Sequence, residues 1–370
     1  YSSQTENNGI MGKIDTFDFD GKYVTWTTDG ANAGTVFYRD GKFNCTNVCG
    51  TIQPKDWNQI DLQFIPYYLN LGTKFSVRLD INPKLMNNMM SKIPLVIPPI
   101  PEQKAIADFL DHKTSEIERL IEIKEKLVKL YEESKTAIIN QAVTKGIDPD
   151  VEYKVSGIEW VGDIPENWEV KRLKYVAIAN PSNIDKKSVD GEKEIFLCNY
   201  TDVYNNNFID EKIDFMKATA SEAQIEKFLL KKGDVIATKD SETPDDIGVP
   251  ALVVHDFDNV VCGYHLTHIK PNKIRGDFLF RNLQSQYNKA YFEVSSNGVT
   301  RYALGVDKID STLVVVPSIA EQKKIVKYIE SETGKIDLLI DNTKKLIELM
   351  KEYKAALISE VVTGKIKVTE

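Results

Sequence analysis

A long segment of the chain occurs twice, and this repeat constrains the fold more than any other feature. Residues 102–147 and 321–366 align without a gap at an offset of 219, with 18 identities in 46 positions. Apolar residues such as Ile117 and Ile336 recur every three or four positions in both copies, which is the period of an amphipathic helix. We therefore expect two long helices whose matching apolar stripes pair with each other in antiparallel orientation.

Local signals mark where each repeated helix begins and ends. Ser318 and Glu321 form a capping box after a proline, and the first copy opens in the proline-rich sequence IPPIPEQ. Gly146 and Gly364 follow the last periodic positions and predict the two helix ends. A second capping signal inside the first copy, opposite Gly334 in the second, predicts a break or bend there. The uninterrupted part would span roughly 45 Å at 1.5 Å per residue.

The apolar stripe on each repeat is wider than a simple helix pair requires. It includes Ile123, Val128 and Ile347 beside the regularly spaced positions. One partner helix cannot cover such a stripe, so the surplus predicts that another protein docks there. A surface helix on each of two separate domains is the alternative.

The segments between the helices also resemble each other. Residues 21–54 and 233–271 each predict a strand, a polar glycine-containing loop, a second strand, a turn and a third strand ending in Ile-x-Pro. A short helical pattern follows in both, and then a polar loop with one arginine, Arg78 or Arg301. The second globule opens with GIEWVGDIPENW, whose counterpart by offset would precede Tyr1. We expect the N-terminal part of the first globule to be absent from this chain.

Composition and charge exclude several classes of protein. The net charge of −8 and the pI of about 5.3 argue against a free-standing, nonspecific nucleic-acid binder. No run of about 18 apolar residues and no signal-peptide pattern occur, so we expect a cytoplasmic protein without membrane contact. The four cysteines are too scattered for a disulfide framework, and we expect buried free thiols and no metal site.

Three segments carry a resemblance to a known family. IPENWEVKRLKYVA lies near the start of the second globule, IPPIPEQKAIADFLDHKTSEIERL opens the first long helix, and VPSIAEQKKIVKYIESETGKIDLL opens the second. The chain resembles the specificity (S) subunit of a type I restriction-modification system. This implies an α+β fold, in which two globular target-recognition domains of mixed strands and short helices are separated by two long helices packed as an antiparallel coiled coil. The implied boundaries are 1–97 for the first recognition domain, 98–147 for the central helical region, 148–316 for the second recognition domain and 317–370 for the C-terminal helical region.

The same resemblance implies a non-catalytic role in DNA recognition. Each recognition domain would read one half of a bipartite double-stranded DNA target, and the helices would set the gap. Half-sites one helical turn apart, about 34 Å, are within reach of such helices. Two methyltransferase (M) subunits would dock on the helices, with restriction and motor (R) subunits as further partners in a prokaryotic cytoplasm. No cofactor is expected in this chain, whereas S-adenosylmethionine is expected in the methyltransferase subunit.

Polar residues in and beside the strand-connecting loops supply the candidate DNA contacts. Asn and Gln pair bidentately with adenine, and Arg or Lys pairs with guanine. Arg78 and Arg301 stand out because both globules carry one arginine in the corresponding loop. The candidates in the first globule are Thr27, Thr28, Asn32, Arg39, Lys42, Asn44 and Arg78. Those in the second are Asn199, Tyr200, Asn205, Asn206, Lys239, Ser241, Thr243, Asn297, Thr300, Arg301 and Tyr302. The four tryptophans, Trp26, Trp57, Trp160 and Trp168, are expected in hydrophobic cores.

The sequence lacks the complete motifs of enzymes that modify, move or cut DNA. An amino-methyltransferase needs a glycine-rich cofactor loop and an Asn/Asp-Pro-Pro-aromatic tetrapeptide, and the nearest string, NPSN from Asn180, lacks the second proline and the ring. A motor needs a phosphate-binding lysine loop. We therefore expect catalysis in other subunits. Two alternatives remain: a coiled-coil scaffold without DNA contact, and the recognition half of a fused restriction enzyme.

Overall fold

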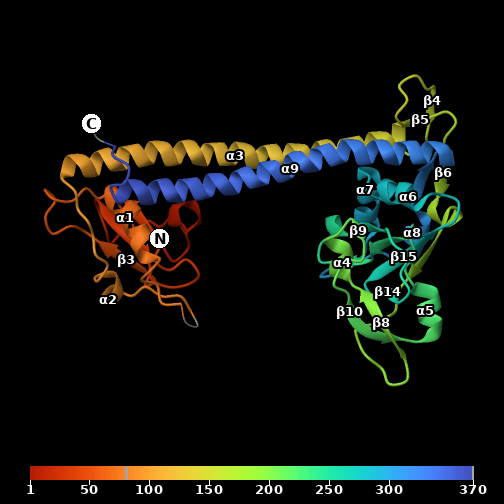
Figure 1. Cartoon of the computed structure of the whole chain (residues 1–370), viewed down its shortest axis with the longest axis horizontal. Helices are drawn as coiled ribbons and strands as arrows, with labels where there is room; N and C mark the ends of the chain where they lie inside the picture. Colours follow the sequence, from red (N-terminus) through yellow and green to blue (C-terminus); the bar gives the residue numbers. More distant parts are fainter. Residues whose placement is uncertain (80–81, 369–370) are drawn as a thin grey trace. The chain divides into compact units, whose positions relative to one another are not determined.

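The chain divides into two compact units. The computed structural model describes residues 1–79 and 82–368. Unit 1 consists of Tyr1–Val128 and Asn342–Glu370, and unit 2 of Lys129–Asp341. Each unit contains one globule and part of both long helices, α3 (Ile100–Lys145) and α9 (Ile319–Val362) (Figure 1). The mixture of helices and strands agrees with the predicted α+β class. The units cut across the helices, so the sequence boundaries given above remain a prediction.

The globule of unit 1 is a small antiparallel sheet with two helices. Its elements are η1 (Glu6–Gly9), β1 (Tyr23–Thr27), β2 (Val36–Arg39), β3 (Cys49–Ile52), α1 (Phe64–Thr73) and α2 (Asn87–Met90). The strand order is β2-β1-β3, with β1 in the centre. Apolar side chains of the sheet and α1 share one core with Ile106 and Leu110 of α3 and Val361 of α9. The globule of unit 1 therefore packs against α3 and α9 through a shared hydrophobic core.

Trp26 determines the packing beneath this sheet. Its side chain is buried, and its indole N–H donates a hydrogen bond to the carbonyl of Leu85 at 3.1 Å. The ring lies against Gly50, where an added Cβ would come within 2.2 Å of the indole. Glycine at this strand position allows the close approach.

Unit 2 contains a five-stranded sheet and a three-stranded sheet. Its strands are β4 (Tyr153–Val155), β5 (Asp163–Pro165), β6 (Glu169–Arg172), β7 (Ala177–Pro181), β8 (Lys193–Cys198), β9 (Phe208–Ile209), β10 (Met216–Ala220), β11 (Val235–Thr238), β12 (Asp240–Ser241), β13 (Pro250–Val253), β14 (Val260–Cys262), β15 (Leu266–Pro271), β16 (Tyr302–Ala303) and β17 (Leu313–Val316). Its other elements are η2 (Leu173–Tyr175), α4 (Tyr200–Tyr204), α5 (Glu222–Phe228), η3 (Pro244–Asp246), α6 (Gly276–Leu283), α7 (Gln286–Ser295) and α8 (Val306–Ser311). One sheet has the order β7-β15-β11-β13-β9 and the other β10-β8-β14, beside the pairs β12-β16, β17-β6 and β4-β5.

The two globules share one structural framework, as their sequences predict. In unit 1, β1 pairs antiparallel with β2 and β3. In unit 2, β11 pairs antiparallel with β13 and β15 in the same order along the chain. The helical patterns that follow become α1 in unit 1 and α6 with α7 in unit 2. The predicted repeat of globule and helix is confirmed at the level of strand pairing.

Both long helices run without interruption, so the predicted break is wrong. α3 spans 46 residues, about 69 Å at 1.5 Å per residue, and α9 spans 44. A glycine inside a helix costs only about 1 kcal/mol, and the buried side chains of Thr333 and Ile336 keep the helix around Gly334 in place. The predicted ends are confirmed, because Gly146 and Gly364 adopt positive φ just beyond the helices. Within the described part of the chain, no helix is both long and apolar enough to cross a membrane.

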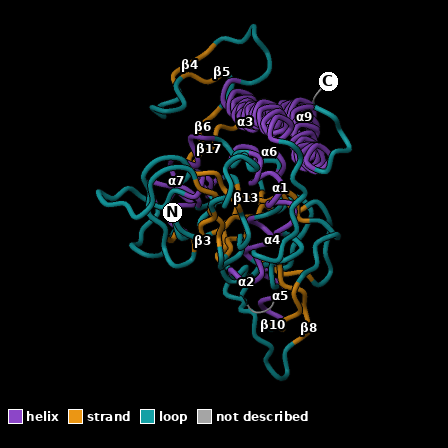
Figure 2. Tube along the Cα trace, turned by 90° about the vertical axis from the view of Figure 1, so that its left-hand side faces the viewer, coloured by secondary structure: helices purple, strands orange, loops and turns teal. Residues whose placement is uncertain are grey.

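Ion pairs show the antiparallel register of α3 and α9 inside each unit. In unit 1, Glu118 pairs with Lys354, and in unit 2, Lys135 Nζ lies 2.5 Å from Asp337 Oδ1. The two pairs occupy equivalent positions of the repeat, since each residue is matched to its counterpart at the offset of 219. Figure 2 shows the two helices side by side. Exposed ion pairs contribute little stability, so these mark the register while the apolar side chains hold the pairing.

A repeated glutamine joins each helix start to its globule. Gln103 is fully buried; its Oε1 accepts from the Asp61 backbone N–H at 2.8 Å and its Nε2 donates to the Pro98 carbonyl at 2.7 Å. Its counterpart Gln322 accepts from the Arg275 N–H at 2.9 Å and donates to the Pro317 carbonyl at 2.9 Å. Identity at this position therefore reflects one shared structural role.

The predictions for tryptophan and cysteine are partly correct. Trp26 and Trp168 are buried, whereas Trp57 and Trp160 lie in loops and are exposed. Trp26 lies in β1 and Trp168 just before β6, and both pack into a core; sequence pattern alone did not separate them from the exposed pair. The four free cysteines divide similarly: Cys198 and Cys262 are buried, while Cys45 and Cys49 are half-buried.

Candidate nucleic-acid interface

Five residues form a polar edge at the end of the central strand in unit 2. They are Lys239, Asp240, Ser241, Arg301 and Tyr302, and we call them the polar edge of unit 2. β11 is buried along its whole length, and β12 follows it directly. β12 pairs with β16, which places Asp240 opposite Ala303 and Ser241 opposite Tyr302. A rigid core thus presents side chains from two segments that are distant in sequence.

Asp240 is the centre of this edge. Its carboxylate Oδ1 accepts from Arg301 Nη2 at 2.7 Å, and its Oδ2 lies 2.7 Å from His265 Nδ1. The Asp240 side chain is 12% exposed, whereas that of Arg301 is 59% exposed. The arginine is therefore held at one end by the protein and open to solvent at the other.

The ammonium group of Lys239 contacts other residues of the protein. Its ammonium donates to the Ser182 carbonyl at 3.0 Å and lies 4.3 Å from the ring centroid of Tyr264. Burial lowers the pKa of Lys239 below its ordinary value. Lys239 therefore links the polar edge of unit 2 to the protein beneath it through Ser182 and Tyr264.

Two stacked tyrosines lie beside the edge. The rings of Tyr200 and Tyr204 stand 5.5 Å apart at 15°, and Tyr204 Oη donates to Asp246 Oδ2 at 2.6 Å. Tyr200 is a hydrogen-bond partner of Ser241, and burial raises the pKa of its phenol above the ordinary value. The predicted residues Tyr200, Ser241, Arg301 and Tyr302 are therefore brought together.

The other predicted residues of unit 2 have mixed roles. Asn199 caps α4, where its backbone N–H donates to Asp202 at 2.7 Å. Asn206 Nδ2 donates to the Asp202 carbonyl at 2.9 Å. The remaining candidates are exposed on loops or at an element end: Asn205, Thr243, Asn297 and Thr300.

Unit 1 has an equivalent polar edge, formed by Thr28, Asp29, Arg78, Asn82 and Lys84. Asp29 faces Lys84 across a β-bridge, just as Asp240 faces Ala303. Asn82 Nδ2 donates to Asp29 Oδ1 at 2.6 Å, and Lys84 Nζ lies 3.5 Å from Asp29 Oδ2. An aspartate after the central strand holds the returning loop in both units.

The two predicted arginines are not equivalent, which corrects the prediction. Arg78 exchanges both backbone hydrogen bonds with Lys84, at 2.9 and 3.1 Å. In unit 2 the same exchange joins Asn297 to Ala303, at 3.0 and 2.9 Å. Arg78 therefore matches Asn297, and Arg301 matches Asn82. The offset of 219 continues through this loop, whereas the presence of one arginine in each loop was a misleading signal.

Arg39 is an interior residue, so its predicted place at the DNA surface is wrong. It is 3% exposed. Its Nη1 donates to the Asn8 carbonyl at 2.7 Å and its Nε to Thr25 Oγ1 at 3.1 Å. Burial lowers the pKa of the guanidinium. Alternation along β2 places Arg39 on the face opposite the core residues Val36 and Tyr38, where the N-terminal segment with Tyr1 and Asn8 covers it.

Thr27 also has an internal role. It is buried, and its hydroxyl donates to the Asn32 carbonyl and accepts from the Thr35 N–H at 3.1 Å. Asn32 itself is exposed and donates to Thr5 Oγ1 at 3.0 Å. Thr28 is buried and its carbonyl accepts from the Leu85 N–H at 3.0 Å.

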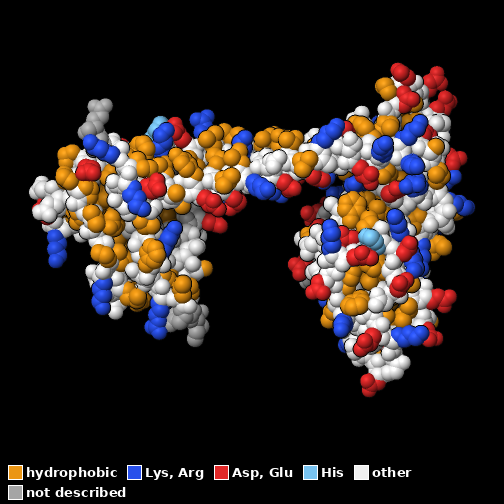
Figure 3. All heavy atoms as spheres, in the orientation of Figure 1, with side chains coloured by type: hydrophobic (Ala, Val, Ile, Leu, Met, Phe, Trp, Pro, Cys, Tyr) orange, Lys and Arg blue, Asp and Glu red, His pale blue; other side chains and the backbone are white. Residues whose placement is uncertain are grey.

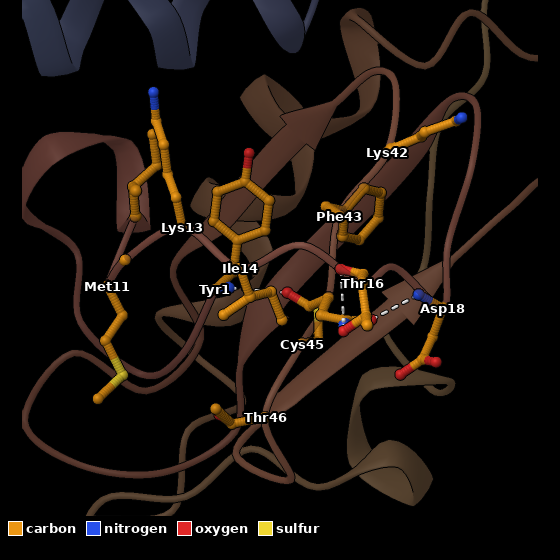
Figure 4. A pocket seen from close by; sticks show the side chains of 13 residues that line it. Tyr1, Met11, Lys13, Ile14, Thr16, Asp18, Lys42, Phe43, Cys45 and Thr46 are labelled. Carbon is orange, nitrogen blue, oxygen red and sulfur yellow. Dashed lines mark hydrogen bonds between the residues drawn. The ribbon is translucent and has the colours of Figure 1, made fainter.

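Lys42 and Asn44 lie away from the polar edge of unit 1. Lys42 follows Gly41, which exchanges backbone hydrogen bonds with Gly21 beyond the other end of β1. Asn44 accepts from the Asp18 N–H at 2.5 Å, within the wall of a hollow of about 840 Å³. Figure 4 shows Lys42 pointing outward from this hollow, with Thr16 and Asp18 side by side. The predicted set of unit 1 is thus split between two ends of the sheet.

Four residues of the two edges and their contacts were not predicted from the sequence: Asp29, Asn82, Asp240 and His265. A signal for the aspartates existed, because each lies two residues after the central strand of its globule, in WTTDG and in ATKDS. His268 is fully buried, with its Nε2 2.7 Å from Asp234 Oδ2.

Comparison with known sequences is consistent with this arrangement. A sequence model of the type I restriction modification DNA specificity domain matches residues 1–129 and 165–349. A putative type I specificity subunit of Mycoplasma pneumoniae is 44% identical over 111 residues, 30% of this chain and 36% of that protein. The specificity subunit of the type I restriction enzyme MjaVIII from Methanocaldococcus jannaschii is 27% identical over 353 residues, 92% of this chain and 78% of that one. The chain thus matches about a third of the length of the first relative.

Solved structures have the same fold. A chain from work on complex assembly and conformational transition of the type I R-M system matches with a TM-score of 0.72 at 12% identity, covering 92% of this chain and 81% of that one. The HsdS subunit from Thermoanaerobacter tengcongensis matches with a TM-score of 0.52 at 14% identity, covering 93% and 81%. With the family match over most of its length, the chain belongs to the type I restriction-modification DNA specificity family.

Proposed function

We propose that this chain is the DNA sequence-specificity subunit of a type I restriction-modification complex and does no catalysis itself. Each unit contributes its polar edge to one half of a bipartite duplex target. The observation that carries the proposal is the pair of equivalent edges on two copies of one sheet, built from different side chains. A shared framework with different edges suits two half-sites of different sequence. A scaffold without DNA contact has no use for that difference.

The paired helices α3 and α9 set the gap between the half-sites in this proposal. Their support is the uninterrupted course of both helices and the antiparallel register in each unit. The net charge of −8 leaves much of the attraction for phosphate to partner subunits. The complex would act in the cytoplasm of a prokaryote, with R subunits as further partners.

Exposed apolar side chains on α3 and α9 offer docking surfaces for two methyltransferase subunits. Repeat-related residues are exposed to the same degree: Leu120 and Leu339 by 48% and 45%, Leu130 and Leu349 by 58% and 59%. Figure 3 shows hydrophobic side chains on the surface along the helices. Leu120 and Leu349 belong to unit 1, and Leu130 and Leu339 to unit 2. One equivalent patch per unit supports two copies of one partner, which would carry the S-adenosylmethionine.

Charged substitutions in one patch are expected to remove one methyltransferase subunit. Burying a leucine contributes about 1.5–3 kcal/mol, so L120E with L349E should leave one bound copy, and L130E with L339E the other. Native mass spectrometry of the assembled complex measures this stoichiometry. K344E changes the net charge by the same two units at an exposed position and should leave two copies bound. Two copies retained by both leucine double variants would contradict this docking.

Selection from a random duplex pool tests the proposed function. The chain assembled with its methyltransferase subunits should enrich two short sequences separated by a fixed gap. A scaffold would enrich none. A fused recognition half would enrich a target without methyltransferase subunits, so the pool is also screened with the chain alone.

A further inference from the structure

We propose that Asp240 and Asp29 are positioning residues for base recognition, each holding one donor side chain of the returning loop against a base edge. Arg301, held by Asp240, would read a guanine in one half-site. Asn82, held by Asp29, would read an adenine in the other. This inference rests on the proposed function and adds which side chains specify a base and what orients them.

Asp240 is placed to orient Arg301 without touching DNA itself. Both of its oxygens are engaged, one by Arg301 Nη2 and one by His265 Nδ1, each at 2.7 Å. The carboxylate is almost enclosed, while most of the Arg301 side chain is exposed. Among the residues that the structure describes, Nε and Nη1 of Arg301 donate no hydrogen bond. The guanidinium is therefore anchored at Nη2, and its Nε and Nη1 donors remain on the open side.

The charge of Asp240 favours base contact over phosphate contact for Arg301. A carboxylate 2.7 Å from the guanidinium cancels much of its attraction for a phosphate anion. It leaves the directional N–H donors, which match the O6 and N7 acceptors of guanine. For a guanidinium that binds only DNA phosphates, a buried carboxylate beside it would weaken the binding.

In unit 1, Asp29 holds Asn82 in the way that Asp240 holds Arg301 in unit 2. The backbone positions agree, because Leu85 N–H donates to the Thr28 carbonyl as Leu304 N–H donates to that of Lys239. The donor differs: Asn82 Nδ2 lies 2.6 Å from Asp29 Oδ1. This bond fixes which end of the Asn82 amide faces the aspartate. One N–H and the carbonyl oxygen remain for adenine N7 and N6.

The loops that return to the two polar edges differ in sequence. Residues 82–84 read Asn-Pro-Lys in unit 1, and 301–303 read Arg-Tyr-Ala in unit 2. The loops share no side chain at these three positions, yet an aspartate holds the first of them in both units. An aspartate that can hold either Asn or Arg suits two half-sites that present different bases.

Alanine variants of the two aspartates test the inference in the assembled complex. D240A should reduce discrimination at one guanine-containing base pair by about tenfold, in one half-site only. D29A should do the same at one adenine-containing pair of the other half-site. Both are measured by selection from the random duplex pool. D307N, at an exposed aspartate 3.5 Å from Lys308 Nζ, should leave both half-sites unchanged.

A double variant separates positioning from a general loss of structure. If Asp240 acts through Arg301, D240A with R301K should discriminate no worse at that base pair than R301K alone. D240A should not weaken the dependence of affinity on salt, as the loss of a phosphate contact would. R301K lies at an exposed position and remains informative if D240A lowers the melting temperature.

Three results would overturn the inference. They are an unchanged motif in D240A and D29A, equal loss of affinity for all sequences in a folded variant, and additive effects of D240A and R301K. Failure of the wild-type complex to enrich any bipartite target is a different result, because it would overturn the proposed function itself.

Discussion

Insertion of one heptad into both α3 and α9 is expected to lengthen the gap of the DNA target while both half-sequences stay the same. The insertions follow Glu125 and its counterpart Lys344, which lie between the two interhelical ion pairs. Seven residues complete nearly two turns, so the apolar faces stay aligned. They add about 10 Å to each helix, which is at most about three base pairs at 3.4 Å each. The measurement is the gap in sequences enriched by the assembled complex.

The same heptad inserted into α3 alone serves as the control. It shifts Lys135 relative to Asp337 and Glu118 relative to Lys354, so pairing in at least one unit must be lost. We expect a lower melting temperature or a changed gap. If both versions keep the wild-type gap and affinity, the helices do not set the spacing.

Alanine at Gly50 is expected to destabilise unit 1 by about 2–3 kcal/mol, the cost of overpacking a core. The added Cβ would lie 2.2–2.5 Å from three carbons of the Trp26 ring, which a hydrogen bond to Leu85 holds in place. Chemical denaturation should show the loss. In the assembled complex, discrimination at one half-site should weaken while the half-site read by unit 2 is retained.

Gly12 provides the matched control, because a Cβ there meets nothing within 4 Å. G12A should match the wild type in stability and in both half-sites. Equal weakening of both half-sites by G50A would contradict separate reading by the two units.

Much of the fold was predictable because the repeat lets one half of the chain be aligned with the other. The spacing of Ile117 and its equivalents indicates helices, and Gly146 and Gly364 predict their ends, which the structure confirms. The continuity of α9 through Gly334 was not predictable, because it depends on tertiary packing around Thr333 and Ile336. Local propensity is a weak signal when buried neighbours support the helix.

The candidate site was harder to predict, because it depends on which side chains face each other across a loop. Polar composition selected Arg301 and Ser241, which the structure brings together, but also Arg39, which the N-terminal segment covers. The aspartates went unnoticed because their importance comes from pairing with residues about 53 and 61 positions away. Applying the offset of 219 to the loop would have matched Asn82 with Arg301.

Photocross-linking from residues 82 and 301 tests the central claim most directly. A cross-linking amino acid replaces Asn82 or Arg301 in the chain assembled with methyltransferase subunits on its enriched duplex. We predict adducts to one half-site from position 82 and to the other from position 301. Adducts from both positions to the same half-site, or to neither, would contradict the account.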